Sequence, residues 1–413
     1  MKYEQLDPMA DDFARLAEDA GILPIGAEVI IDGPRVKKSD VDEAAYATYR
    51  LLIALHDIFK QRYGGSLEAF GHALGHTSHD LEVYLWDQGT FTPEVFTRAD
   101  TVLTDEGFKF VEFNVGSSVG GMVNSSLAYL LGFPQQDVPL QAWAQHVAKR
   151  IPSGSLGILV EDEGPLDKMR RDLNVMAQQL EQAAGVTAIV CSQKELSWDG
   201  EQLCIGGRKI DWVYPLFFPN NVAADPESYS ALRAALCENR VFMPITRRAN
   251  IFGSKMALAM LHDIAATESV DSPFRQLVER WVAWTTRLDE GRLSFAIEHQ
   301  QYLVLKPVLG LGGKGVVIGR ETDPDSWRQA LTGALVQQQE MFILQHFYPP
   351  AVETVTTSHS QHGRRSYEAR CVWGIYTLDG HSGGTPFMRS SPVLRTAVIN
   401  YATGGSVGAL PMR

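Results

Sequence analysis

The feature that most constrains the fold is an alternation of apolar segments between residues 156 and 218. Residues 156–160 form a short apolar run, residues 166–184 have helical spacing, and residues 186–192 are strand-like again. This order is typical of a βαβ unit, in which a helix joins two parallel strands. Residues 212–218 predict a further strand. The sequence therefore predicts an α/β protein that contains a parallel, Rossmann-like domain.

A second pattern lies at residues 303–320, LVLKPVLGLGGKGVVIGR. Gly310, Gly312 and Gly315 fit the GxGxxG spacing of dinucleotide-binding loops, but β-branched residues follow them where that motif requires a helix. Lys314 precedes Gly315 rather than Ser or Thr, which is inconsistent with a Walker A loop. The segment thus predicts strand, glycine loop, strand. Two interpretations stay open, namely an ordinary hairpin with a mobile tip and a loop that brings backbone N–H groups to a phosphate.

Length and charge bound the organisation of the chain. At 413 residues it is long for one hydrophobic core, and we expect two or three domains. The net charge of −12 argues against nucleic acid or an anionic membrane as the main partner, because both require a basic surface.

Targeting signals and cysteine spacing indicate the compartment. The start, MKYEQLDPMADDF, is acidic and lacks an apolar core, and no run reaches the length of a membrane span. Cys191, Cys204, Cys237 and Cys371 lie far apart and show no metal-binding spacing. We expect them to be reduced core thiols of a cytoplasmic protein.

The region before residue 132 contains a polar β-hairpin. Residues 101–103 and 108–113 predict two strands joined by the turn at 104–107, and a loop of small residues follows at 115–121. The hairpin therefore leads into a loop where the backbone can approach a ligand.

Acidic and amide side chains gather on this hairpin. If its strands pair across the turn, Asp100 and Glu112 lie close together, and Asn114 shares the strand face of Glu112 because it is two residues further on. Two carboxylates and an amide oxygen suit Mg²⁺, which combines few protein ligands with phosphate oxygens. A solvated hairpin edge with outward polar residues is the alternative.

Further basic and polar residues occur downstream. Lys255 opens a predicted helix at FGSKMALAML, Lys306 lies on the strand before the glycine loop, and Gln345 follows a strand at 342–344. Additional helices are predicted at 274–287 and 325–339.

These parts in this order resemble the ATP-grasp superfamily. The stretches TRADTVLTDEGFKFVEFN, FGSKMALAML, LVLKP and FILQHF carry the resemblance, which covers about a quarter of the chain. In particular they are similar to the carboxylate–amine ligases related to the synthetase domain of glutathionylspermidine synthase, where the Glu-x-Asn motif precedes the ATP lysines. The resemblance implies an ATP-grasp domain at 251–413 with a lid at about 300–350, preceded by a Rossmann-like substrate domain at 151–250 and a helical region with the metal hairpin at 1–150.

The resemblance also implies roles for individual residues. The implied Mg²⁺ ligands are Asp100, Glu112 and Asn114. The implied catalytic residues are Arg98, Lys255, Lys306 and Arg389. The implied ATP contacts are Lys255, Lys306, Gly310, Gly312, Gly313, Lys314, Gly315 and Gln345. The implied substrate contacts are Ser117, Ser118 and Asn400. Arg370, which apolar residues flank, is also expected to contact an anionic substrate.

The implied activity is ATP-dependent ligation of a small carboxylate to an amine through an acyl phosphate. Val115-Gly116-Ser117 and the glycine tip depart from the family pattern where substrate is touched, so glutathione and polyamine specificity is not transferred. The alternatives are a catalytically silent ATP-grasp protein and an NAD-linked oxidoreductase built on the βαβ unit. The acidic loop at 161–163 disfavours the oxidoreductase, because it would repel a phosphate. A homodimer is the commonest assembly for such enzymes.

Three histidines, His72, His76 and His79, have a spacing that imitates metal ligands on one helix face. No carboxylate or cysteine partner accompanies them, so we expect exposed or substrate-contacting histidines rather than a zinc site.

Overall fold

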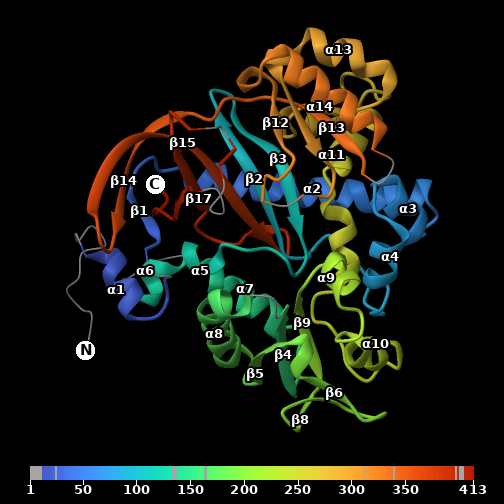
Figure 1. Ribbon diagram of the computed structural model, residues 1–413, viewed down its shortest axis with the longest axis vertical. Helices are drawn as coiled ribbons and strands as arrows, with labels where there is room; N and C mark the ends of the chain where they lie inside the picture. The colour runs from blue at the N-terminus through green and yellow to red at the C-terminus, as the bar shows by residue number, and fades with distance from the viewer. Residues whose placement is uncertain are drawn as a thin grey trace.

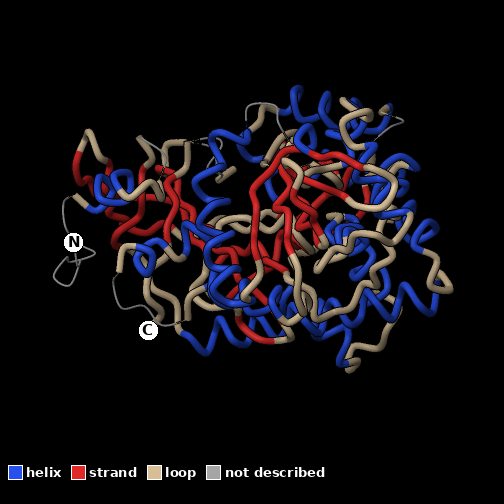
Figure 2. Tube along the Cα trace, turned by 90° about the horizontal axis from the view of Figure 1, so that it is seen from below, coloured by secondary structure: helices blue, strands red, loops and turns tan. Residues whose placement is uncertain are grey.

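The fold is mixed α/β, with strands in the interior and helices mostly outside them (Figures 1 and 2). The computed structural model describes residues 12–23, 26–132, 137–161, 165–310, 312–337, 340–395, 398–399 and 404–413, with residues 165–169 described as backbone only. Among these residues, no helix combines the length and the apolar character that a bilayer crossing demands.

The largest sheet joins segments from both ends of the chain. Its strand order is β14-β1-β18-β17-β15-β2-β3, with β16 beside β15. The strands are β1 (Glu28–Asp32), β2 (Thr97–Thr104), β3 (Gly107–Val115), β14 (Val352–His359), β15 (Gly363–Leu378), β16 (His381–Ser382), β17 (Phe387–Pro392) and β18 (Ser406–Gly408). The predicted hairpin is confirmed as β2 and β3, and β2 pairs antiparallel with β15. Strands from both sides of residue 150 therefore belong to one sheet.

One face of this large sheet is covered by α2 (Lys38–Arg62), the long blue helix of Figure 1. Leu51, Leu52 and Leu55 on α2 are fully buried. Burial of such a side chain contributes about 1.5–3 kcal/mol. Because α2 closes this face, the opposite face of the sheet is the one left for a ligand.

A smaller antiparallel sheet has the order β10-β13-β11-β12. Its strands are β10 (Thr285–Arg287), β11 (Leu303–Pro307), β12 (Val317–Ile318) and β13 (Phe342–His346). The glycine segment is thus confirmed as strand, loop, strand. Helices α13 (Leu293–Glu298) and α14 (Pro324–Val336) lie over this sheet (Figure 1), and Trp327 and Leu331 of α14 form a core with Leu305 and Leu344.

The predicted helix at 274–287 is too long. Helix α12 (Pro273–Trp281) ends before Val282, and residues 285–287 form strand β10 against β13. The β-branched Thr285 and Thr286 are poor helix formers, and pairing with β13 satisfies their backbone groups.

The predicted βαβ unit is confirmed. Strands β4 (Ser155–Val160), β5 (Thr187–Ser192) and β9 (Trp212–Leu216) form a parallel sheet in the order β5-β4-β9, with α8 (Pro165–Ala184) as the crossover. Helix α7 (Pro139–Ala148) packs beside α8. A separate antiparallel ribbon contains β6 (Leu196–Trp198), β7 (Leu203–Ile205) and β8 (Arg208–Ile210).

The remaining described elements are short. They are α1 (Phe13–Asp19), α3 (Leu67–Ala73), α4 (Ser78–Tyr84), α5 (Met122–Ser125), α6 (Leu127–Leu130), α9 (Pro219–Ala224), α10 (Ser230–Cys237), the 3-10 segment η2 (Arg247–Gly253) and α11 (Met256–Ala265). Cys191 and Cys371 are buried as expected, but Cys204 is half-buried and Cys237 is exposed at the end of α10.

Candidate functional site

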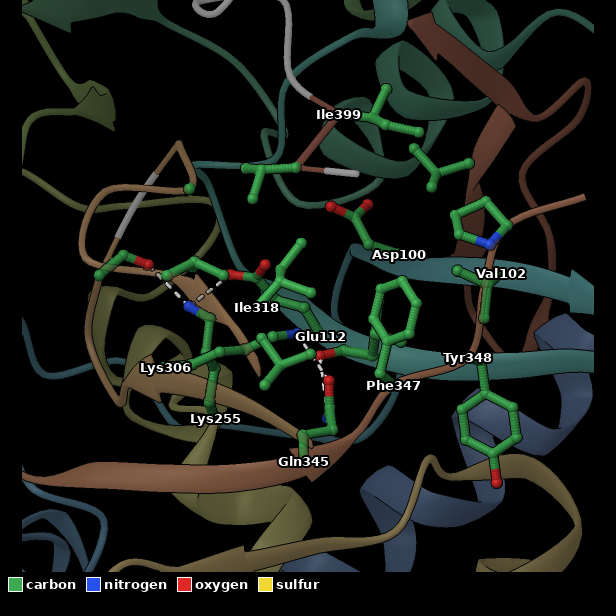
Figure 3. A pocket seen from close by; sticks show the side chains of 18 of the residues that line it. Asp100, Val102, Glu112, Lys255, Lys306, Ile318, Gln345, Phe347, Tyr348 and Ile399 are labelled. Atoms are coloured by element: carbon green, nitrogen blue, oxygen red, sulfur yellow. Dashed lines mark hydrogen bonds and ion pairs between the residues drawn. The ribbon is translucent and has the colours of Figure 1, made fainter. Parts of the chain in front are cut away.

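A crevice of about 140 Å³ lies between the free face of the large sheet and the small sheet. The large sheet contributes Asp100 and Glu112 to its lining, and the small sheet contributes Lys306 and Gln345 (Figure 3). Arg389 of the large sheet also lines it. The acidic hairpin and the basic residues downstream, which are far apart in sequence, therefore face one another.

Asp100 and Arg389 line one side of the crevice, and Arg98, which is not part of the lining, contacts Asp100; we call these three residues the arginine wall. Arg98 donates from Nε to Oδ1 of Asp100 over 2.7 Å, and Nη2 of Arg389 lies 2.9 Å from Oδ2. Burial alone would raise the pKa of Asp100, but the charges of Arg389 and Arg98 outweigh it and lower the pKa to about 2. Asp100 is therefore ionised throughout the physiological range, and it fixes both guanidinium groups.

The arginine wall depends on a glycine in the strand between its members. Arg389 lies on β17 and Asp100 on β2, and β15 runs between these two strands. Gly374 of β15 pairs with Asp100, and a Cβ at Gly374 would come within 2.6 Å of Cδ of Arg98. Sequence reasoning did not single out Gly374, although an isolated glycine in the strand-like run CVWGIYTL signals close approach of other groups.

The other side of the crevice, the lysine wall, consists of Lys255 and Lys306. Lys255 immediately precedes α11, and its Nζ lies 2.8 Å from Oε1 of Glu112 and donates to the carbonyl oxygen of Gly310 over 2.6 Å. One cation thus connects the acidic hairpin to the first residue of the glycine loop.

Lys306 projects from β11 to Gln345 of β13. Its Nζ donates to Oε1 of Gln345 over 2.6 Å, and Nε2 of Gln345 donates to Thr285. Burial lowers the pKa of Lys306 to about 8, although Glu112 opposes that shift. A buried cation whose pKa is this low is poised to gain from a phosphate beside it. The Gln345 amide is occupied in positioning Lys306.

The glycine loop lines the crevice and the cavity beside it. Gly310, Gly313 and Lys314 line the crevice, and Gly312 and Gly315 line the adjoining cavity. Backbone φ angles of +64° at Gly312, +78° at Gly313 and +72° at Gly315 explain why glycine occupies these positions, because a side chain strains the backbone there.

Two of the three predicted metal ligands, Glu112 and Asn114, each have a side-chain oxygen without a protein partner among the described residues. In the described part of the chain, no hydrogen bond or ion pair engages Oε2 of Glu112 or Oδ1 of Asn114, whose Nδ2 donates to the carbonyl oxygen of Arg98. These two oxygens are hard donors on one strand face and suit Mg²⁺. Both oxygens of Asp100 already accept from arginines, so Asp100 could coordinate only after one of those contacts opened. The described residues contain no group of three or more His, Cys, Asp or Glu side chains that could hold a metal.

The predicted substrate residues are dispersed. Ser118 lines the adjoining cavity and accepts from Asn250, whereas Ser117 is buried and its carbonyl oxygen accepts from Tyr214. Arg370 lies outside the lining of both cavities and pairs with Glu321 at 3.3 Å. Asn400 lies outside the described residues.

The three histidines do not share a helix face. His72 lies on α3, His76 in the turn after it and His79 on α4. Each ring contacts a backbone carbonyl, of His76, Ile251 and Pro219 respectively. Of the three, only His76 lines a cavity.

The adjoining cavity has a volume of about 680 Å³, and we call it the second cavity. It shares Glu112, Lys255 and Gly310 with the crevice, and it extends from there to α4 and the start of α9. The two spaces therefore adjoin at the lysine wall, where Lys255 and Glu112 line both. A ligand in either space would lie beside these two residues.

Comparisons with known proteins give a structural similarity and no match in sequence. No protein-family model matches the chain, and neither does any curated protein. Among solved structures it is similar to D-alanyl-alanine synthetase A from Vibrio cholerae O1 biovar eltor, with a TM-score of 0.36 and 14% identity over 64% of this chain and 75% of that one.

Proposed function

We propose that this chain is an ATP-grasp enzyme that joins a small carboxylate to an amine and releases ADP and phosphate. The observation that carries the proposal is that the arginine wall, the lysine wall, Glu112 and residues of the glycine loop meet at one crevice. Lys255, Lys306 and Arg389 from the two walls and Lys314 from the glycine loop line this crevice, and four cationic side chains suit the charge of a triphosphate.

The nucleotide is proposed to lie with its phosphates between the two walls. Nε of Arg389 is buried and has no hydrogen-bond partner among the described residues, which leaves a donor for an anion. Val304, Ile318 and Phe347 give the crevice an apolar part that suits adenine, and the chain after Gln345 offers backbone groups to it. Gly310 to Gly315 would close over the phosphates and exclude water.

Mg²⁺ is proposed to be held by Glu112 and Asn114 together with phosphate oxygens, with Asp100 joining only if an arginine contact opens. When bound, the metal would offset the charge that builds up on the transferred phosphate. Lys255 would then be released from Glu112 to contact phosphate.

The proposed reaction has two steps. A carboxylate oxygen of the first substrate attacks the γ-phosphorus, the bond to the β-phosphate oxygen breaks, and ADP leaves. The nitrogen of the amine then attacks the acyl carbon and loses a proton, and phosphate departs with the electrons of the C–O bond. Arg98, Arg389, Lys255 and Lys306 serve both steps by orienting and neutralising anions, so no nucleophilic side chain is needed.

The other expectations for the chain remain part of this proposal. They are an ATP-grasp domain at 251–413, a substrate domain at 151–250, action in the cytoplasm and assembly as a homodimer. A catalytically silent nucleotide-binding protein is the alternative, and the retention of both walls together with Glu112 favours the enzyme.

The test compares the wild type with Glu112→Gln. The wild type is incubated with ATP, Mg²⁺ and mixtures of amino acids, short peptides and amines, and ADP and phosphate are measured. We expect turnover to fall by about 100-fold or more in the variant, as for the loss of one group that stabilises developing charge. Glu106→Gln, which changes an exposed carboxylate in the turn of the same hairpin, is the matched control.

Three outcomes would contradict the proposal. Full activity of Glu112→Gln would show that Glu112 is not a required Mg²⁺ ligand. Release of AMP and pyrophosphate would point to adenylation. Tight ATP binding without turnover in any mixture would favour the silent protein.

A further inference from the structure

The second cavity has a polar wall remote from the lysines. This wall contains Asp80 and Tyr84 of α4 together with His76 from the turn before it. It is built from the N-terminal helices, and none of its groups has a role in the phosphate chemistry proposed above.

Asp80 presents one oxygen that is held and one that is free. Oδ2 accepts from the backbone N and from Oγ1 of Thr77, each over 2.8 Å, in the capping box that begins α4. No hydrogen bond or ion pair to Oδ1 occurs within the described part of the chain. The cap therefore fixes the carboxylate while leaving an acceptor for a ligand.

His76 offers a second acceptor in the same wall. The ring is 4% exposed, and Nε2 lies 3.1 Å from the carbonyl oxygen of Ile251, so Nε2 carries the proton and Nδ1 holds a lone pair. Nδ1 is buried and has no partner among the described residues. Burial lowers the pKa of His76, which keeps the ring neutral and Nδ1 an acceptor near pH 7.

The charges of the second cavity differ between its two ends. At the end shared with the crevice, Lys255 and Glu112 neutralise one another at 2.8 Å. Lys314 lines that same end, on the glycine loop. In the described structure, no basic side chain forms an ion pair with Asp80. The end away from the phosphates therefore carries an unpaired carboxylate beside the free Nδ1 of His76.

We infer that the second cavity binds a substrate that carries a protonated amine, and that Asp80 is its anchor, with Nδ1 of His76 as a further acceptor. The catalytic role of this substrate rests on the proposed function, which places the phosphates of ATP beside the second cavity. An ammonium group has three donors and no acceptor, so it matches a wall that offers free acceptors. A charge-assisted hydrogen bond to a carboxylate is also stronger than a neutral one.

The test is a titration without nucleotide, so its result does not depend on ATP turnover. The probes are n-butylamine, which is protonated at pH 7, and two molecules of similar size, n-butanol and butyrate. Binding is followed by calorimetry and by chemical shifts of the His76 ring. We expect n-butylamine to bind best and to lose about tenfold or more in affinity in Asp80→Asn, as for the loss of a hydrogen bond to a charged group.

Two further variants separate recognition from folding. An asparagine or glutamine at position 80 can still accept from Thr77, so Asp80→Asn and Asp80→Gln both retain a capping acceptor. Glu82→Gln changes the next carboxylate of α4, which pairs with Arg233 outside the cavity, and should leave binding unchanged. Equal binding of n-butylamine by the wild type and both Asp80 variants, or equal binding of n-butanol and n-butylamine by the wild type, would overturn the inference. Loss of ATP turnover in Glu112→Gln with amine binding retained would show that the two sites are separable.

Discussion

The two walls of the crevice hold their charges in different ways. In the arginine wall, Asp100 is enclosed by two guanidinium groups on a sheet whose other face is covered by α2. In the lysine wall, Lys255 and Lys306 contact Glu112, a loop carbonyl and an amide, all of which are neutral or available to another partner. Apart from Nε of Arg389, the arginine wall therefore has its partners within the protein, whereas the lysine wall has partners that a ligand can replace.

Because of this difference, we expect the arginine wall to hold its geometry and the lysine wall to bind the ligand. A buried ion pair is costly to break, so the arginine wall is expected to keep one geometry whether or not nucleotide is bound. A buried lysine with a lowered pKa gains when an anion arrives. The predictions below test this contrast, from the largest expected effect to the smallest.

Removal of the charge of Asp100 tests the arginine wall. Asp100→Asn leaves two buried guanidinium groups without their counter-ion, and we expect the free energy of unfolding to fall by about 3–5 kcal/mol. Urea denaturation measures it. Asp105→Asn, in the exposed turn of the same hairpin, should change stability by less than about 0.5 kcal/mol. A similar small change in Asp100→Asn would mean that the arginine wall is not a stabilising unit.

Removal of Lys306 tests the lysine wall, and here we expect no loss of fold stability. Lys306→Met removes a buried cation, so the stability of the fold should be nearly unchanged or increased. Affinity for MgATP should fall about 10- to 100-fold, as for the loss of a hydrogen bond to a charged group. Calorimetric titration measures this affinity, with Lys60→Met on the exposed side of α2 as the control. Unchanged affinity would remove Lys306 from the site.

A change of pH tests the lysine wall without a substitution, because loss of the proton of Lys306 should affect fold stability and MgATP affinity in opposite directions. Lys306 has a pKa of about 8 in the folded chain against 10.5 for an unperturbed lysine. Between these values the unfolded chain binds more protons, so this group makes the folded state more stable as pH rises. Affinity for MgATP should fall over the same range, by up to about fivefold from pH 8 to 9, because the cation is lost. Lys306→Arg should retain the affinity at pH 9, and a wild type that binds equally at pH 7 and 9 would contradict the assignment.

A substitution in the glycine loop is expected to have the smallest effect, a modest loss of turnover. Gly315→Ala places a side chain at a φ of +72° and within 3.1 Å of Cγ of Pro307, at a cost of about 1–2 kcal/mol. If the loop closes over phosphates, turnover should fall about fivefold or more, as measured by ADP release. Gly333→Ala in α14 has open space for its Cβ and should retain full turnover. Equal turnover in both variants would favour an ordinary hairpin tip.

Local patterns predicted the elements that carry the charged groups. The hairpin with Asp100 and Glu112, the strand with Lys306 and the parallel βαβ unit are all found where periodicity and turn residues indicated them. Short-range signals suffice here because each element is fixed by its own apolar spacing. The helix expected at 274–287 ended early because β13, more than fifty residues downstream, pairs with residues 285–287.

The sequence by itself determined an α/β chain, an acidic hairpin, a pair of downstream lysines and a glycine loop, since these follow from residue types and spacing within short segments. Only the tertiary structure decided that β15 and β17 pair beside the hairpin, that Gly374 opens a path for Arg98, and that Arg389 reaches Asp100 across it. The physical reason is that strand order in a sheet depends on contacts between residues hundreds of positions apart, and no local propensity encodes them. The same long-range packing places Asp80 and His76 in one cavity with Lys255.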